Sequence, residues 1–274
     1  MLRRVTLIVA IYCTLGIAAP RLIDAQNLFE VQVFPDENLA PRETQIEIHT
    51  VAMPSGTRLP DGTLDPSAHL HLSTELSHGW SDVFETGLFI ETSPGRGDRH
   101  AAFTGWHIRP KIRLPRWQSV PWHISFGFEY AFLKEPGDVA FRQAVAITPI
   151  VEHHHEAFEL SINPGIEIPV KGAGAGSPPT FTPSAKAAVK VAQSTWASLE
   201  YYAETGSIKH FEPLADQHHI VMPAVDLRTA VGWDVNVGIG RGLTGASEHW
   251  VVKSIVAVRL PMHDRIAANR RSQR

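Results

Sequence analysis

Histidine and serine two positions apart offer this chain its simplest route to nucleophilic chemistry. The pair occurs twice, as His71 with Ser73 and as His123 with Ser125. Alternate residues of a β-strand share one face, so each imidazole of a strand could take the proton of its serine hydroxyl. Two short residues at this spacing are also common by chance, and the chain has neither a G-x-S-x-G elbow nor an H-E-x-x-H motif. Hydrolysis therefore stays an alternative, and we predict no catalytic residue.

Histidine runs raise metal binding as a second possible chemistry. His153, His154 and His155 precede Glu156, and His218 is followed by His219. Neighbouring residues of a strand point to opposite faces, so three consecutive rings reach one ion only where the chain turns. The triple run lies where we predict a short turn, and a solvated turn explains it better than a metal site does. We predict no metal ligand and no cofactor.

The elements that carry these residues show a period of two. Residues 122–132 read WHISFGFEYAF, with aromatic and aliphatic side chains on one face and polar or small ones on the other. About ten such residues cross a bilayer when the strand is tilted, whereas strands of soluble proteins average about five or six. The segment is therefore predicted to be a transmembrane strand.

The same alternation recurs along the chain. Clear examples are 70–76, 106–114, 158–170 and 250–260, and weaker ones are 44–51, 82–92, 139–151, 181–192, 195–206, 218–227 and 232–240. The total is about twelve, an even number as in bacterial outer-membrane barrels. We predict an all-β fold: a closed antiparallel transmembrane β-barrel of about twelve strands after an N-terminal signal peptide. Pro110 and Pro164 lie inside two of the clear strands and predict an edge or a bulge there.

Charge decides which face of the strands meets lipid. A lysine or arginine at the bilayer midplane costs about 2–4 kcal/mol, so the polar face is predicted to line the lumen. The candidate lumen-lining residues are His107, Arg109, Lys111, Arg113, His123, Glu129, Glu159, Asn163, Glu167, Glu200, Lys253 and Arg259. Their mixed signs leave two interpretations open: rows of opposite charge along an aqueous path, or ion pairs that fill the lumen.

The ends of the chain predict its compartment. Arg3 and Arg4 precede an apolar run and a short polar region ending at Ala25, as in a secretory signal peptide. Cys13 lies within it, so the mature chain has no thiol. Removal of residues 1–25 takes away three of 25 basic and one of 28 acidic residues, leaving 22 against 27, with no electrostatic footprint for nucleic acid. We divide the chain into a signal peptide (1–25), an N-terminal periplasmic segment (26–43), the barrel (44–260) and a basic C-terminal tail (261–274).

The connections between predicted strands alternate in length. Long gaps near 52–67, 93–101, 134–138, 171–180, 207–217 and 241–248 alternate with generally tighter ones. Outer-membrane barrels have long external loops and short periplasmic turns, which predicts both termini in the periplasm. The Gly/Pro/Ser-rich 171–180 is then an external loop and not a phosphate cradle, because no helix pattern follows it.

Four motifs carry a family resemblance. They are ELSHGWSDVFETGLFI (75–90), LSINPGIEIPV (160–170), LEYYAETG (199–206) and WDVNVGIGRGLTGASEHWVVKSIVAVRL (233–260). In this order they resemble the outer-membrane β-barrel family catalogued as "MetA-pathway of phenol degradation" proteins. The resemblance implies an outer-membrane barrel with a role in the passage of small, aromatic or hydrophobic compounds, and it carries no catalytic residue. A tail after Leu260 replaces the terminal aromatic residue that the insertion machinery reads in many barrels.

These observations together predict a passive outer-membrane channel or facilitator for small molecules. Its predicted partners are outer-membrane lipid, the barrel-assembly machinery and a small solute, with no nucleic acid. Two alternatives remain: a phospholipase-like outer-membrane hydrolase, and a soluble secreted β-barrel, lipocalin-like or β-sandwich binding protein. A hydrolase of this kind presents its His-x-Ser pair to lipid, whereas both pairs here fall on the face assigned to the lumen.

Overall fold

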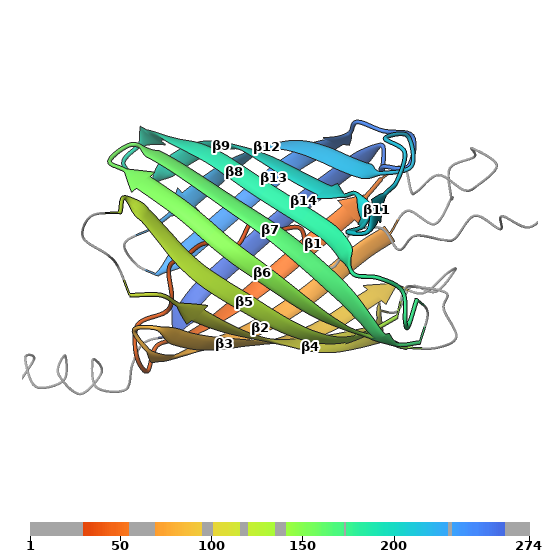
Figure 1. The fold of residues 1–274 in the computed structure, drawn as a ribbon. Helices are drawn as coiled ribbons and strands as arrows, with labels where there is room; N and C mark the ends of the chain where they lie inside the picture. The colour runs from red at the N-terminus through yellow and green to blue at the C-terminus, as the bar shows by residue number, and fades with distance from the viewer. Residues whose placement is uncertain are drawn as a thin grey trace, which may run out of the picture.

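The fold is a closed barrel of antiparallel strands (Figure 1). The computed structural model describes residues 30–54, 69–94, 101–115, 120–134, 141–172, 174–229 and 232–260. The predicted signal peptide and the C-terminal tail lie outside these residues. Among the residues described, no helix is long and apolar enough to cross a membrane.

Twelve of the fourteen strands form the wall. The strands are β1 (Thr44–Met53), β2 (His69–Ser81), β3 (Phe84–Pro94), β4 (Ala101–Arg113), β5 (Trp122–Leu133), β6 (Arg142–His155), β7 (Phe158–Lys171), β8 (Thr180–Ala192), β9 (Thr195–Glu204), β10 (Gly206–Ser207), β11 (His210–Phe211), β12 (His218–Arg228), β13 (Trp233–Gly242) and β14 (Trp250–Leu260). Each wall strand pairs with its neighbours in the chain, and β14 pairs with β1 to close the circle. The two-residue β10 and β11 belong to the connection between β9 and β12. The prediction of about twelve antiparallel strands is confirmed.

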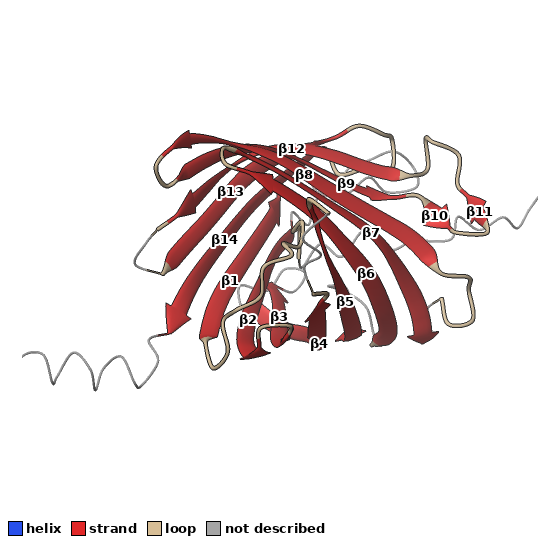
Figure 2. Ribbon diagram, turned by 60° about the vertical axis from the view of Figure 1, so that its left-hand side comes forward, coloured by secondary structure: helices blue, strands red, loops and turns tan. Residues whose placement is uncertain are grey.

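The wall strands are tilted and long (Figure 2). They span 10 to 14 residues, which matches the reach of a tilted transmembrane strand. Their alternation separates two faces. On β1 and β2, for example, Ile48 and Leu72 are exposed outside, while His49 and Ser73 are buried inside. Hydrocarbon can solvate the first pair but not the second, so the outer face suits lipid.

Prolines interrupt the ladder without changing its register, which differs from the edge or bulge that we predicted. Between β4 and β5 the pairing passes from Ile108 opposite Tyr130 to Lys111 opposite Gly127, so that Pro110 is skipped and the register is unchanged. Pro164 of β7 is likewise passed over in the pairing with β6. Proline lacks an N–H and omits a single ladder bond, and the bonds on either side preserve the alignment.

The chain before β1 lies inside the barrel. Residues 30–39, which we call the lumenal segment, run along the interior of the wall as the red trace in Figure 1 and contact β4, β5, β7 and β14. We expected 26–43 to be a periplasmic segment, and residues 30–39 correct that expectation. Their main-chain polar groups find partners on the inward faces of the strands, because those faces carry polar side chains.

Candidate functional site

Asp36 anchors the lumenal segment to the wall. Its carboxylate lies 2.8 Å from Nη2 of Arg113 and 3.2 Å from Nδ1 of His123, and it accepts a 2.6 Å hydrogen bond from Ser125 Oγ. Asp36 is 1% exposed. A buried carboxylate is stable only where cations and donors surround it, so these three wall residues fix Asp36 in place.

Main-chain groups of the segment are bound as specifically. Asn163 of β7 accepts a 2.7 Å bond from the Phe34 N–H and donates a 3.2 Å bond to the Phe34 carbonyl. Lys111 donates to the carbonyls of Pro35 and Glu37 at 3.2 and 2.7 Å. Lys253 donates to the Val31 carbonyl at 3.1 Å. The wall therefore recognises this stretch of chain through three strands.

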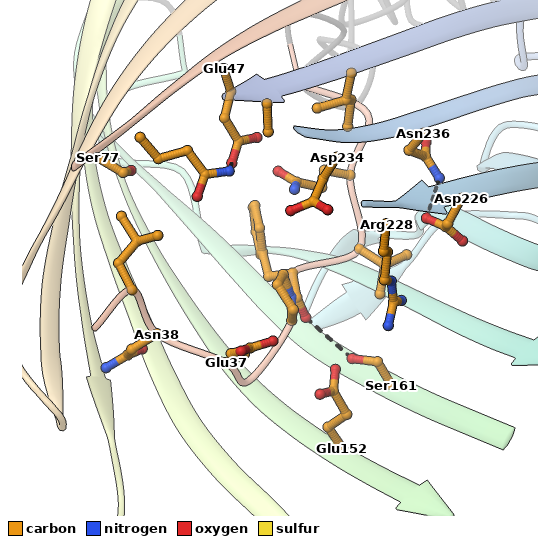
Figure 3. Close-up of a pocket in the computed structure, with 18 of the residues that line it drawn as sticks. Glu37, Asn38, Glu47, Ser77, Glu152, Ser161, Asp226, Arg228, Asp234 and Asn236 are labelled. Carbon is orange, nitrogen blue, oxygen red and sulfur yellow. Dashed lines mark hydrogen bonds between the residues drawn. The ribbon is translucent and has the colours of Figure 1, made fainter. Parts of the chain in front are cut away.

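A cavity of about 980 Å³ lies beside the lumenal segment (Figure 3). Its lining includes Glu47 at the start of β1, Asp82 in the β2–β3 turn and Ser194 in the β8–β9 turn. It thus occupies the half of the lumen nearest the short turns, which we call the turn-side half. Figure 3 shows Glu152, Ser161, Asp226 and Arg228 gathered around it.

The lining is more acidic than basic. Eleven acidic and seven basic side chains are among the described residues that line the cavity. Every one of the seven has a carboxylate partner, and the pairs are Arg109–Glu30, Lys111–Glu85, Arg113–Asp36, Lys186–Asp226, Arg228–Glu159, Lys253–Glu200 and Arg259–Asp234. The positive charge of the wall is therefore neutralised, and the surplus charge facing the cavity is negative.

The other half of the lumen, towards the long loops, is packed; we call it the loop-side half. Val31 and Val33 of the lumenal segment join Val51, Met53, Tyr202, Ile220, Met222 and Val251 in one buried apolar cluster. Small inward residues of β13 make room for it: a Cβ on Gly238 would lie 2.7 Å from Sδ of Met222. The cavity thus lies between the turns and this packed layer.

The twelve candidate lumen-lining residues all belong to inward faces but occupy different environments. Those that line the cavity are Arg109, Lys111, Arg113, Glu159, Glu200, Lys253 and Arg259. The other five are His107, His123, Glu129, Asn163 and Glu167. Three of them contact the lumenal segment: His107 lies 3.3 Å from Glu30, His123 contacts Asp36, and Asn163 binds Phe34. Glu129 and Glu167 line a small separate pocket. The basic residues among the twelve are ion-paired, but these pairs border a cavity and do not fill the lumen, so both arrangements that we left open stay predictions.

Neither His-x-Ser pair forms a catalytic dyad. His71 Nδ1 lies 2.7 Å from Ser93 Oγ, while Ser73 donates to Glu91 at 2.8 Å. His123 and Ser125 both bind Asp36. The described geometry therefore does not join either serine to the histidine two positions away.

The histidine runs belong to strands. His153 and His154 lie in β6, with His154 close to Glu152 and 3.7 Å from Glu159 inside the barrel, and His153 bonded to the Pro121 carbonyl. The run thus ends a strand, where we predicted a turn, and its rings alternate between faces. His219 of β12 pairs with Tyr201 at 2.6 Å.

Sequence reasoning missed the lumenal segment and Glu30, His49 and Glu75. The segment has no strand period, and its hydrogen bonds with Lys111 join residues more than 70 positions apart. The one clue in the sequence was the presence of the apolar residues Val31 and Val33 near the acid Asp36. This stretch had been assigned to the periplasm, so the clue did not point to the lumen.

Comparison with known proteins shows the fold. No family model matches the chain, and no curated protein matches it. Among solved structures, the COG4313 outer membrane channel from Pseudomonas putida F1 aligns with a TM-score of 0.59 at 10% identity, over 84% of this chain and 100% of that one. The KdgM porin aligns at 0.52 and 9% identity, over 80% and 99%. The NanC porin aligns at 0.51 and 7%, over 80% and 100%.

These likenesses leave the membership in the phenol-degradation family a prediction. They agree with the lipid-suited outer face and the closed wall, which indicate an outer-membrane location. The architecture of this chain is that of the outer-membrane channels and porins.

Proposed function

We propose that the protein is a passive outer-membrane channel for small solutes, held closed by its own lumenal segment. The observation that carries the proposal is the position of residues 30–39. They line a polar cavity of about 980 Å³, complete the packed loop-side layer through Val31 and Val33, and are bound by side chains of the wall, not by strand pairing. Such a segment can leave without breaking the barrel, because every wall strand keeps both of its neighbours.

The cavity favours small neutral or cationic solutes. Its volume lies within the range of small-molecule sites, about 300–1,000 Å³. Its basic residues are paired with carboxylates, and the surplus charge is negative. An anion therefore meets repulsion without a free cation to bind it, whereas aromatic compounds, which the family resemblance implies, meet the ring of Phe34 in the lining.

The proposed preference for neutral or cationic solutes differs from the ligand of one structural neighbour. The KdgM porin was solved in complex with oligogalacturonate, which is a polyanion. A pore for polyanions needs unpaired cations along its path. The described cavity of this chain offers the opposite surplus, so we do not extend that ligand to it.

The test is conductance of the refolded mature chain in a planar bilayer, compared with a variant that lacks residues 26–39. Heat-modifiable gel migration shows that both samples are folded barrels. We expect rare or small current steps from the full chain and large, stable steps from the shortened one. A folded, inserted but silent shortened variant would refute the channel. Equal steps from both chains would keep the channel but refute closure by the segment.

A further inference from the structure

A buried group of acids and histidines includes one residue of the lumenal segment, and the proposed channel assigns its histidines no role. It consists of Glu30, Glu47, His49, Glu75, Glu91, His107 and Glu129 with Arg109, and we call it the Glu/His cluster. Glu30 comes from the lumenal segment and the others from β1 to β5. The ring of Phe89 stacks on His107 at 3.9 Å and meets His49 edge-on at 6.1 Å, so apolar surface backs both imidazoles.

Two sets of possible metal ligands converge within the cluster. Glu30, His49 and Glu75 each offer one ligand atom, and these atoms lie within 4.8 Å of one another. Glu30, His107 and Glu129 form a second set with the same property. Glu30 belongs to both, so one residue of the lumenal segment joins the two sets.

Arg109 orients the carboxylates for this role. It contacts Oε1 of Glu30 and lies 3.4 Å from Oε1 of Glu75. The other oxygen of each carboxylate faces a histidine: Glu75 Oε2 lies 3.3 Å from His49 Nε2, and Glu30 Oε2 lies 3.3 Å from His107 Nε2. The guanidinium therefore leaves one oxygen of each acid directed at an imidazole nitrogen, as outer-shell partners do in metal sites.

The histidine nitrogens are buried without hydrogen bonds. His49 is 1% exposed and His107 is 0% exposed, and neither ring nitrogen of either residue has a hydrogen-bond partner in the described structure. Their contacts with the carboxylates at 3.3 Å lack hydrogen-bond alignment. A buried polar group without a partner is costly, so these nitrogens indicate a ligand between them and the acids.

The charge of the cluster also calls for cations. The cluster holds five carboxylates and one guanidinium, and protonation of both histidines would still leave the acids in excess. Two divalent ions with neutral histidines would balance the five carboxylates and Arg109. Mixed imidazole and carboxylate donors suit first-row transition ions such as Zn²⁺.

We propose that the Glu/His cluster binds divalent transition-metal ions through Glu30, His49 and Glu75 and through Glu30, His107 and Glu129. Glu47 and Glu75 also line the turn-side cavity, which gives the ions a way in. An ion in the first set joins the lumenal segment to β1 and β2, and an ion in the second joins it to β4 and β5, with Glu30 shared by both. This inference concerns binding alone and does not depend on the proposed channel.

The experiment measures Zn²⁺ bound to the full mature chain in detergent after gel filtration, by elemental analysis and calorimetric titration. Co²⁺ in place of Zn²⁺ gives visible absorption bands that report nitrogen and oxygen ligation. The test variants are Glu30→Gln and His49→Gln. The matched control is Glu37→Gln, an exposed acid on the same segment, and heat-modifiable migration verifies the barrel in each sample.

We expect the wild type and Glu37→Gln to retain one or two ions per chain, and Glu30→Gln to lose affinity by at least about tenfold. His49→Gln should lose the site that contains it. Absence of retained metal in the wild type, or equal retention in Glu30→Gln, overturns the proposal. A His153→Gln/His155→Gln variant tests the half-buried His153 and the exposed His155 at the end of β6, and loss of binding there assigns the metal to the surface and likewise overturns the proposal.

Discussion

The turn-side and loop-side halves of the lumen have the same wall and different fillings. In the turn-side half, ion pairs such as Arg259–Asp234 are partly exposed, at 41% and 29%, and border a cavity. Where the cavity meets the packed layer of the loop-side half, Lys253–Glu200 is 1% exposed at both ends and touches Tyr202. The same inward alternation of polar residues thus yields solvated pairs at one end and buried pairs at the other.

The lumenal segment and the size of inward side chains explain this difference. Val31 and Val33 complete an apolar layer with large residues such as Met53 and Met222. The turn-side wall carries mostly charged side chains, which extend into water and do not fill space. The barrel is therefore closed in its loop-side half by packed apolar side chains, and its turn-side half is lined by charged side chains.

The largest expected effect comes from breaking the buried ion pair. Lys253 lies 2.5 Å from Glu200 and donates to Tyr202 and the Val31 carbonyl. Lys253→Met leaves a buried carboxylate without its cation, and we expect a loss of about 3–5 kcal/mol in the free energy of unfolding. Urea unfolding of the protein in lipid vesicles measures it.

The matched change in the turn-side half is Arg259→Met. Because its pair with Asp234 is partly exposed, we expect a loss within about 1 kcal/mol. Equal losses in the two variants would contradict the distinction between a dry and a solvated half.

A second prediction concerns packing. Met222 is fully buried and fits against Gly238 and Gly240, so Met222→Ala should leave a void and cost about 2–5 kcal/mol. Ile255 borders the cavity, so Ile255→Ala adds to existing space and should cost less. The same unfolding assay compares them, and a larger loss for Ile255→Ala would refute the assignment of the packed layer.

The strands could be predicted from sequence because a wall between lipid and polar lumen imposes one period throughout. Residues 122–132 were predicted and Trp122–Leu133 is observed; residues 218–227 were predicted and His218–Arg228 is observed. Even the weaker patterns fell within a few residues of real strands.

The filling of the lumen could not be predicted in the same way. The lumenal segment has no regular period, and the wall holds it through residues such as Asn163 and Lys253, 129 and 222 positions away. His49 and Glu75 meet through the register of β1 and β2, and Glu30 reaches them only because the lumenal segment lies inside the barrel. The alternation of polar and apolar residues predicts which face of a strand a residue lies on. It does not predict the register and tilt of the strands, which determine which inward residues contact one another.

A third prediction tests the charge of the turn-side half. Arg109, Lys111 and Arg113 pair with Glu30, Glu85 and Asp36, and removal of residues 26–39 takes away Glu30 and Asp36, which leaves the charges of Arg109 and Arg113 without these two partners. Changing all three to glutamine in the variant lacking residues 26–39 should raise the preference of the pore for cations over anions severalfold. Reversal potentials in a salt gradient measure this preference.

The control for that experiment is Arg241→Gln, which removes a charge from the exposed arginine that bonds to the His249 carbonyl at the loop-side rim. We expect its selectivity to match the parent. If the triple variant conducts with unchanged selectivity, its three side chains do not line the path of the ions.

The smallest expected effect lies in the loop between β13 and β14, outside the membrane. Burial raises the pKa of the Glu248 carboxyl above its ordinary value of 4.5, and Glu248 is 1% exposed. The folded state therefore holds this proton more tightly than the unfolded chain does. Stability from Glu248 is present below pH 4.5 and is lost as the pH rises through the raised pKa.

Glu248→Gln removes this titration. At neutral pH the variant should have a slightly higher unfolding midpoint than the wild type, and the gap should narrow as the pH falls below 4.5, because the wild-type carboxyl is then neutral in both states. Glu156→Gln, in the turn between β6 and β7, is the exposed control and should show no such trend. If the difference in unfolding midpoint between variant and wild type widens as the pH falls, the folded loop prefers the charged form of Glu248. The loop-side rim would then stabilise a charged side chain, as the turn-side half does.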